Sequence, residues 1–428
     1  MTTIATLHSL FLNCTSVSTD TRKIEKDSLF VALKGENFDA NTFAKEALEK
    51  GAKYVIIDNP SYKIDERTLL VEDSLIALQE LAKFHRNYLG LPIIALTGSN
   101  GKTTTKELIH AVLSKKYNTL ATIGNLNNHI GVPLTLLRFT KETEIGIVEM
   151  GANHQKEIEF LCKIAQPDYG YITNFGKAHL EGFGGVEGVI KGKSEMYDYL
   201  RNNQKIAFIN LDDAIQKEKA IGIKQFSFGL NELNVDVKID KVEANPMVKI
   251  SFNDLTINSH LIGIYNANNI NAAITIGNYF KVSDEQIKEA IENYIPENNR
   301  SQLIQKNGNE IILDAYNANP SSMSAAITNF IQLEHNHKIA VLGDMFELGE
   351  ESLSEHKKII ALLISETNIT TYFIGKDFYA NQVQNSHIKF FENFENFATF
   401  FKANQPKESL ILIKGSRGMA LEKTLELI

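Results

Sequence analysis

The chain has 428 residues, which at roughly 150 residues per domain is enough for about three domains. Its 44 basic and 52 acidic residues give a formal net charge of −8, and this balance argues against a general nucleic-acid-binding protein, which needs a basic face. With 43% hydrophobic residues, only two cysteines and no apolar run near the ~18 residues of a membrane span, we expect a soluble cytoplasmic protein that is not inserted in a membrane.

The first 88 residues have the pattern of a small α/β domain. Short apolar runs that are typical of strands alternate with stretches of helical spacing. The last helical stretch is followed by Gly90 and Pro92, which end a helix and place a domain boundary after residue 88. The expected strands are 28–33, 54–58 and 68–72, and the expected helices are 43–48 and 75–88.

Residues 89–298 have the pattern of a larger central α/β domain. Apolar strands, glycine turns and helices alternate, which indicates a mostly parallel sheet with helices on both faces. Between about 234 and 262 the apolar residues change to a period of two, so we expect antiparallel strands added to that sheet. The expected parallel strands are 93–97, 145–149, 169–173 and 205–209, with a helix at 106–115.

Residues 299–428 again alternate strands and helices, and we expect a second doubly wound, Rossmann-like α/β domain. No internal repeat or low-complexity tract interrupts the pattern. The fold class is therefore α/β with three domains. The expected strands of the last domain are 311–314, 338–342, 371–374 and 409–413.

The strongest local signal lies between an apolar strand and a helix, in the segment Thr97-Gly-Ser-Asn-Gly-Lys-Thr-Thr104. Glycines at such a place let backbone N–H groups surround phosphate oxygens, while Lys102 reaches the terminal phosphates and Thr103 can hold Mg²⁺. An ordinary glycine turn with a capping threonine is the alternative. The expected phosphate loop consists of Gly98, Ser99, Asn100, Gly101, Lys102, Thr103 and Thr104.

Other polar residues of the central domain follow strands or open helices. Glu149 ends a strand, where a carboxylate beside a phosphate loop can ligate Mg²⁺ or can be a solvated charge. His179 follows the next strand, and a lone histidine is more often structural. Lys193 by itself is typical of a solvated helix charge. Asn266 and Asn269 could contact adenine or could cap a helix.

Three polar loops follow strands in the third domain. They contain Asp314-Ala-Tyr-Asn317-Ala-Asn319-Pro, Gly343-Asp344-Met-Phe-Glu-Leu-Gly349 and Lys414-Gly-Ser-Arg417. Each could be plain turn chemistry. Because the carboxyl ends of parallel strands are where an α/β domain builds a site, the three together indicate a binding site.

These motifs, in this order, resemble the Mur ligase family of ATP-dependent amide-forming enzymes. The resemblance runs from Ser18-Thr-Asp-Thr-Arg22 to Lys414-Gly-Ser-Arg417, essentially the whole chain. Three segments point to the branch that adds D-alanyl-D-alanine to UDP-N-acetylmuramoyl-tripeptide. They are Glu149-Met-Gly-Ala-Asn-His154, Tyr316-Asn-Ala-Asn-Pro320 and Val341-Leu-Gly-Asp-Met-Phe-Glu-Leu-Gly349.

The resemblance implies a role for each domain and for single residues. The first domain would hold the UDP-sugar, the second ATP, and the third would close over nucleotide and dipeptide, in a monomer. Two Mg²⁺ ions are implied, one at Thr103 and Glu149 and one at Glu149 and His179, with Lys193 carbamylated to support the second. Nucleotide contacts are implied for Asn266, Asn269, Arg300 and Asp314, and substrate contacts for Ser18, Asp20, Arg22, Asn153, Asn317, Asn319, Asp344 and Arg417.

Rival functions stay open at this point. A sibling ligase of the family could add another amino acid, or glutamate to folate. A P-loop kinase would transfer phosphate without forming an amide, and a nucleotide-sensing module would have no activity. The sequence does not distinguish diaminopimelate from lysine as the third residue of the tripeptide.

Overall fold

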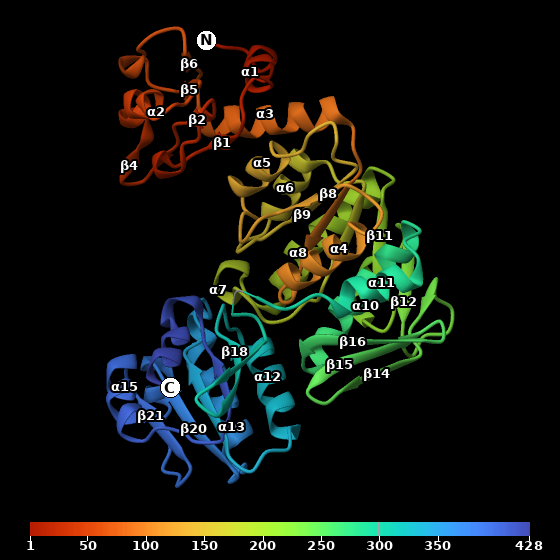
Figure 1. The fold of residues 1–428 in the computed structure, drawn as a ribbon, viewed down its shortest axis with the longest axis vertical. Helices are drawn as coiled ribbons and strands as arrows, with labels where there is room; N and C mark the ends of the chain where they lie inside the picture. Colours follow the sequence, from red (N-terminus) through yellow and green to blue (C-terminus); the bar gives the residue numbers. More distant parts are fainter. Residues whose placement is uncertain (298) are drawn as a thin grey trace.

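The computed structural model describes residues 1–297 and 299–428. The boundary that the sequence predicts after residue 298 touches Asn298, which lies outside the described residues. Three sheet-containing parts follow one another along the chain, with the first at the top of Figure 1, the second in the middle and the third below. No helix within the two described stretches has the length and apolarity to cross a membrane.

The first part is built on a four-stranded parallel sheet in the order β1-β2-β5-β6. Its apolar residues are buried on both faces, which is usual for a parallel sheet. The strands are β1 (Val17–Ser18), β2 (Leu29–Val31), β5 (Tyr54–Ile57) and β6 (Thr68–Leu70), and a hairpin is formed by β3 (Lys34–Gly35) and β4 (Phe38–Asp39). The helices are α1 (Ile4–Phe11), α2 (Ala44–Glu49) and α3 (Ser74–Leu89).

Helix α3 connects the first part to the second. Asp73 caps its first turn, and Gly90 ends it in a left-handed conformation with φ 66°. Figure 1 shows α3 lying between the first sheet and α5 and α6 of the central part. Its buried residues therefore belong to a core that continues from one part into the next.

The central part contains a seven-stranded parallel sheet in the order β13-β12-β11-β10-β7-β9-β8. After β7 the chain forms β8 and β9 on one side of that strand, and then β10 and the following strands on its other side. The carboxyl end of β7 is therefore a topological switch point of the sheet. The strands are β7 (Ile93–Thr97), β8 (Thr119–Ala121), β9 (Ile145–Glu149), β10 (Tyr169–Ile172), β11 (Ile206–Asn210), β12 (Lys224–Gly229) and β13 (Val237–Lys238).

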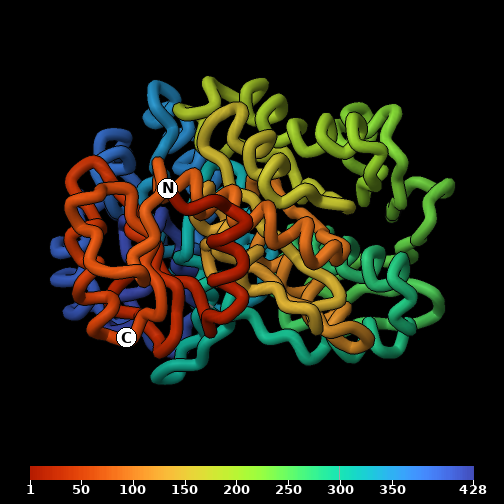
Figure 2. Tube along the Cα trace, turned by 90° about the horizontal axis from the view of Figure 1, so that it is seen from above, coloured from red at the N-terminus to blue at the C-terminus, as the bar shows by residue number. Residues whose placement is uncertain are grey.

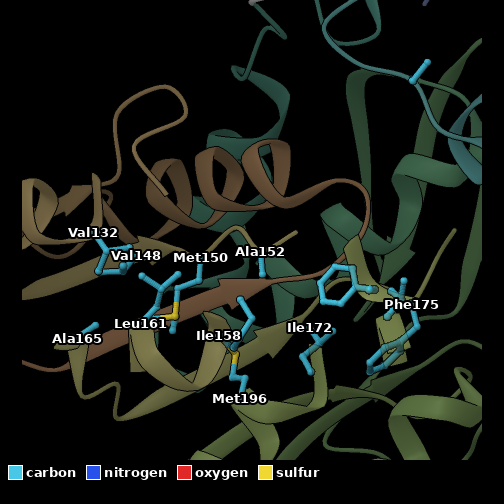
Figure 3. Close-up of a cluster of buried hydrophobic side chains, with 14 of the residues drawn as sticks. Val132, Val148, Met150, Ala152, Ile158, Leu161, Ala165, Ile172, Phe175 and Met196 are labelled. Carbon is cyan, nitrogen blue, oxygen red and sulfur yellow. The ribbon is translucent and has the colours of Figure 1, made fainter. Parts of the chain in front are cut away.

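Helices cover both faces of this sheet. Figure 3 shows one core, in which Val148, Met150 and Ile172 meet Leu161 of α6 and Met196 of α8. The opposite face packs against α4 and α10. The helices are α4 (Lys102–Leu113), α5 (Gly131–Leu136), α6 (Glu157–Ala165), α7 (Leu180–Phe183), α8 (Val186–Asn202), α9 (Ala214–Lys219), α10 (Ala267–Tyr279) and α11 (Asp284–Glu292).

The period-two segment forms antiparallel strands, but they are not added to the parallel sheet as the sequence analysis predicts. β14 (Lys241–Ala244), β15 (Met247–Phe252) and β16 (Leu255–Ile262) form a separate three-stranded sheet. Its inward residues pack against the α10 and α11 layer instead. Residues 237–238, at the start of the same segment, do join the large sheet. They form its edge strand β13, which pairs with β12 in the parallel and not the predicted antiparallel direction.

The third part has a six-stranded sheet in the order β17-β18-β22-β19-β20-β21, parallel except for β17. Its strands are β17 (Gln302–Lys306), β18 (Asn309–Asp314), β19 (Lys338–Gly343), β20 (Ile369–Ile374), β21 (Ile388–Phe391) and β22 (Leu410–Lys414). Its helices are α12 (Pro320–Gln332), α13 (Ser352–Leu363), α14 (Lys376–Ala380) and α15 (Phe394–Ala403). In Figure 2, seen from above, the first part lies in front of the third, and Figure 1 places these two at opposite ends of the long axis.

Candidate active site

The site lies at the carboxyl end of β7, where the central and third parts meet. A cavity of about 860 Å³ is lined by the loop after β7, by the segments at the ends of β9 and β10, by the loop after β18, and by Lys414 at the end of β22. Residues more than 200 positions apart are thus brought to one space. Of the predicted site residues, the cavity is lined by Ser99, Asn100, Gly101, Lys102, Thr103, Thr104, Glu149, Asn153, His179, Asn266, Asn269, Arg300, Asp314, Asn317 and Asn319.

The loop after β7 is held by glycines and by neighbouring strand ends. Gly98 has φ 141°, and a Cβ there would lie 2.0 Å from Thr173 Oγ1. Gly101 has φ 78°, and its Cβ would lie 2.5 Å from Asn269 Oδ1. Asn174, after β10, accepts a hydrogen bond from Asn100 N at 3.1 Å. Only glycine fits at these two points, so the loop backbone lies close to the ends of its neighbours.

Lys102 begins α4 and turns back over its own loop. Its ammonium donates to Gly98 O at 2.7 Å and to Ser99 O at 3.2 Å. Surrounding protein atoms lower the pKa of Lys102, and Glu149 opposes that shift. Two neutral carbonyls leave the positive charge without a counter-charge in direct contact, so this end of the cavity suits an anion.

Glu149 is nearly fully buried at the end of β9, next to β7. Thr103 Oγ1 donates to its Oε2 at 2.9 Å, and Asn127 Nδ2 donates to its Oε1 at 2.7 Å. Thr122 Oγ1 accepts from Glu149 N at 3.0 Å. Asn127 and Thr122 were not identified from the sequence, where the segment Asn125-Leu-Asn-Asn128 is the only signal in that loop.

Lys193 is fully buried in α8. Its Nζ donates to Ala152 O at 3.1 Å and lies 4.9 Å from the centre of the Phe183 ring. Burial, and then the nearby positive charge of Lys102, lower the pKa of Lys193 well below its ordinary value. Lys191, two positions earlier, is exposed. The buried amine is therefore suited to the neutral form.

His179 is turned toward the third part of the chain. Its Nδ1 is hydrogen-bonded to Glu347, in the loop after β19. Neither His179 nor Lys193 touches Glu149 through a hydrogen bond in the described residues, and no cluster of three or more His, Cys, Asp or Glu side chains is found there. The structure thus brings Glu149 and Thr103 together but leaves His179 with a different partner.

Asn266 and Asn269 are buried and hydrogen-bonded within the protein. Asn266 donates to Ile262 O at 2.8 Å and accepts from Asn269 at 2.8 Å. Asn269 in turn accepts from Thr105 Oγ1 of α4 at 3.0 Å. These amides hold α10 against the phosphate loop. Both residues also line the cavity.

Two loops of the third part face the cavity. Lys414 Nζ donates to Asp314 Oδ2 at 2.6 Å across the paired strands β18 and β22. The Arg300 guanidinium lies 3.5 Å from the centre of the Tyr316 ring. Asn319 caps α12, and its amide donates to Asn100 Oδ1 at 2.7 Å. The third part is therefore in direct contact with the phosphate loop.

Asp344 is not brought to the cavity, contrary to the substrate role that the sequence analysis implies. Its buried carboxylate accepts hydrogen bonds from Asp377 N and Phe378 N, both at 3.0 Å, at the start of α14. The Asp344 side chain also lies 3.6 Å from His356 Nε2. These contacts assign Asp344 to holding the loop after β19. Arg417 is also outside the lining, exposed beside Tyr316 and 3.8 Å from Glu422.

Ser18, Asp20 and Arg22 lie in the first part, away from the cavity lining. Ser18 Oγ donates to Asp20 O at 2.9 Å. The Arg22 side chain donates three hydrogen bonds to the carboxylate of Asp20, and Arg22 N donates a fourth; together they lower the pKa of Asp20 to about 2. The three residues form one local turn and do not contact the nucleotide-sized cavity.

Comparisons with known families match three consecutive segments of the chain. Residues 13–86 match the model of the Mur ligase family, catalytic domain. Residues 96–277 match the Mur ligase middle domain, and residues 299–417 match the Mur ligase, glutamate ligase domain.

Curated relatives and solved structures match almost the whole chain. The UDP-N-acetylmuramoyl-tripeptide--D-alanyl-D-alanine ligases of Bacillus subtilis and Escherichia coli are 36% and 35% identical, each covering 96% of this chain and 92% of the relative. A crystal structure of MurF from Acinetobacter baumannii has a TM-score of 0.85 at 34% identity, covering 96% of this chain and 92% of its own. MurF ligase from Thermotoga maritima in complex with ADP has a TM-score of 0.84 at 28% identity, covering 97% of both.

Proposed function

The chain belongs to the Mur ligase family, and from that premise we infer that it joins D-alanyl-D-alanine to UDP-N-acetylmuramoyl-tripeptide at the expense of ATP. The product is the UDP-N-acetylmuramoyl-pentapeptide of peptidoglycan synthesis. The observation that carries this function is the shared cavity, in which a phosphate loop faces polar loops of the third part. A ligase needs that arrangement, because two anionic substrates and an amine have to meet in one place.

The nucleotide phosphates bind the loop after β7. Gly98 and Gly101 let the loop backbone pack closely against Thr173 and Asn269, and Lys102 and Arg300 supply positive charge. Adenine and ribose then extend toward Asn266, Asn269 and Asp314 on the same wall. That this fold binds an adenine nucleotide is supported by the Thermotoga maritima relative, which is in complex with ADP.

Mg²⁺ fits beside the phosphates at Thr103 and Glu149. A hydroxyl and a carboxylate in contact are oxygen ligands of the kind that Mg²⁺ prefers. When bound, the ion neutralises charge on the phosphoryl group that is transferred. A second ion would use Glu149, His179 and a carbamate on Lys193, as the resemblance to the family implies.

The carbamate is supported by the surroundings of Lys193. An ammonium there would have one carbonyl and one ring face as partners while fully buried, which is costly. A neutral amine can react with CO₂, forming an N–C bond and losing one proton. The product carries one negative charge and two oxygen ligands, which suit a hard cation better than an amine does.

The chemistry has two steps. The terminal carboxylate of the tripeptide attacks the γ-phosphorus of ATP, so that ADP leaves and an acyl phosphate forms. The free amine of D-alanyl-D-alanine then attacks the acyl carbon, and the tetrahedral intermediate expels phosphate. Lys102 stabilises charge on the transferred phosphoryl group, and the contact of Asn319 with Asn100 keeps the dipeptide-side loop against the phosphate loop.

The dipeptide site consists of Asn317 and Asn319 in the cavity lining, which also contains Asn153. Arg417, outside the lining but beside Tyr316, would have to turn inward to join it. Ser18, Asp20 and Arg22 in the first domain bind the UDP-sugar, whose length carries the tripeptide to the cavity. The three domains are 1–88, 89–298 and 299–428. A cytoplasmic, monomeric enzyme is the setting that we propose.

The test is an assay of phosphate release from ATP with UDP-N-acetylmuramoyl-tripeptide, with and without D-alanyl-D-alanine. We expect release that depends on the dipeptide, and at least about a hundredfold loss of kcat in Lys102→Ala, the scale of one lost electrostatic stabiliser. Lys116→Ala, an exposed lysine just after the same helix, serves as the control. ADP formation without free phosphate would indicate a kinase, and release with another amino acid would indicate a sibling ligase.

A further inference from the structure

Tyr316, in the loop after β18, lies beside two arginines that come from different segments of the third part. The centre of its ring is 3.5 Å from the guanidinium of Arg300 and 5.4 Å from that of Arg417. Both distances are within the roughly 6 Å over which the face of an aromatic ring attracts a cation. Tyr316 and Arg300 line the cavity, whereas Arg417 lies outside its lining. One ring is thus within reach of a cation of the cavity and of a second cation outside it.

The charge of Arg300 is not neutralised by a carboxylate. In the part of the chain that the structure describes, Arg300 forms no ion pair, and Asp314, which lines the same cavity, is paired with Lys414 at 2.6 Å. Burial is the main cause of the lowered pKa of Lys102, and the positive charge of Arg300 adds to it. The guanidinium therefore acts on the phosphate-loop end of the cavity, where its charge is available to an anion.

The backbone that carries Arg300 is fixed against the loop that carries Tyr316. Both neighbours of Arg300 are non-glycine residues in the left-handed region, Asn299 with φ 58° and Ser301 with φ 49°. Tyr316 N donates to Asn299 O at 3.1 Å, and Ser301 N donates to Asp314 Oδ1 at 3.2 Å. Such conformations persist only where the surrounding contacts require them, and they concentrate at functional sites. The turn thus keeps the Arg300 side chain next to the ring.

The segment that carries Arg417 is anchored to the same loop. Ser416 Oγ donates to Ala318 O at 3.3 Å and accepts from Phe346 N at 2.9 Å. The side chain of Arg417 is 62% exposed, with Glu422 at 3.8 Å. An exposed side chain changes rotamer within nanoseconds. The backbone at Arg417 is therefore held near Tyr316, while its guanidinium can turn along the ring toward the cavity.

From this arrangement we propose that Tyr316 is a positioning residue that aligns two cations, Arg300 for the nucleotide phosphates and Arg417 for the carboxylate of the dipeptide. The negative face of the ring attracts a guanidinium and orients it. A carboxylate in the same place would also neutralise the charge, and the cation would then bind a substrate anion less well. The ring therefore holds both arginines and leaves their charges for the substrates.

The proposal rests on the proposed function, because it takes the nucleotide phosphates and the dipeptide carboxylate as the two anions. It adds that a single side chain sets the position of both cations. The nucleotide end and the dipeptide end of the site are then aligned with each other, which is the orientation that an attack of the dipeptide amine on the acyl phosphate needs.

The first experiment measures the affinity of the full chain for ADP with Mg²⁺ by isothermal titration calorimetry. We expect Tyr316→Leu to weaken binding about 3- to 30-fold, the range for one cation–ring contact. Tyr316→Phe keeps the ring face and should stay within about twofold of the wild type. Tyr379→Leu, at an exposed tyrosine of the third part outside the cavity lining, is the matched control. Equal losses in Tyr316→Phe and Tyr316→Leu would overturn the proposal, because the ring face would then not be the cause.

A double-mutant cycle with Arg300→Ala separates positioning from a general effect on the fold. We expect Tyr316→Leu combined with Arg300→Ala to bind ADP no more weakly than Arg300→Ala alone, since the ring then has no Arg300 to hold. Additive losses, or a larger loss in Tyr316→Leu than in Arg300→Ala, would contradict a role through Arg300.

The second experiment measures phosphate release at saturating ATP. We expect Tyr316→Leu to raise the KM for D-alanyl-D-alanine, and to raise it no further when Arg417→Ala is already present. An unchanged KM in Tyr316→Leu would overturn the assignment of Arg417. If the wild type does not respond to the dipeptide, the ligase function fails, while the ADP cycle still decides the role of Tyr316. If the wild type does respond and the ADP cycle is additive, the function stands and the alignment by Tyr316 fails.

Discussion

Lys193 illustrates how a single residue changes meaning once its surroundings are known. In the sequence it is one of 44 basic residues on the chain, in a helix where a solvated charge is the ordinary interpretation. In the structure it is fully buried, while Lys191 of the same helix is exposed. The low pKa of its amine follows from that burial and from the positive charge of Lys102.

We expect Lys193→Ala to lose most ligase activity and Lys191→Ala to keep it. Acetate or bicarbonate should restore part of the activity of Lys193→Ala, because a small carboxylate can supply the oxygen ligands of the lost carbamate. Removal of CO₂ from the wild type should reversibly lower kcat. The measurements are phosphate release and intact-protein mass under CO₂. An active, unmodified Lys193 with nucleotide bound would contradict the carbamate.

At the scale of an element, the loop after β19 and the start of α14 depend on Asp344. Its carboxylate accepts hydrogen bonds from two backbone N–H groups in the first turn of α14, which have no acceptor within that short helix. Gly375 completes the arrangement, because a Cβ there would lie 2.2 Å from Asp344 Cγ. The desolvated carboxyl has a raised pKa, with burial as the main cause and the backbone hydrogen bonds opposing it.

We therefore expect Asp344→Ala to lower the free energy of unfolding by about 1–2 kcal/mol, the range for losing a helix cap. Urea unfolding of the full chain measures the change. Asp377→Ala, which keeps the carboxylate of Asp344 and the backbone N–H, is a control for the neighbouring charge. A stable Asp344→Ala protein with only a raised KM for D-alanyl-D-alanine would instead indicate direct contact with the dipeptide.

At the scale of the whole molecule, side chains of the central and third parts are in direct contact. Glu355 of α13 is almost fully buried there and pairs with Lys177 of the central part and Lys358 of its own helix. The desolvation of this carboxyl is offset by hydrogen bonds from both lysines, and the net effect lowers the pKa of Glu355. Substitution of Lys177 therefore removes the interdomain partner of Glu355 and leaves its partner within the third part, Lys358, in place.

We expect Lys177→Ala to shift the protein toward an open arrangement, with a larger radius of gyration in solution scattering and a raised KM for ATP. Lys358→Ala also removes one partner of Glu355, but within its own domain, and should leave the radius of gyration unchanged. Higher salt should have less effect on the Lys177→Ala variant than on the wild type. Equal radii for all three proteins would show that this pair does not contribute to closure.

The predicted α/β fold with three domains is confirmed. It could be predicted because the signals for its main strands and helices lie in consecutive residues. Apolar runs bounded by glycine and proline identify β7, β9 and β18, and the phosphate loop was recognised from a few consecutive residues. Family resemblance extended these signals to the function. The strands β8, β17 and β21 were not predicted, because they are short or edge strands whose pairing depends on distant neighbours.

The sequence by itself determined the α/β class, the family and the residues around Lys102, because hydrophobic period and loop chemistry are properties of consecutive residues. Only the tertiary structure decided which residues contact one another and which side chains are buried. It turned His179 toward Glu347, buried Lys193, placed Asp344 at α14, and separated the strands 241–262 from the large sheet. These outcomes depend on contacts between residues far apart in the chain, and the packing and desolvation of a side chain are set by that whole group of neighbours.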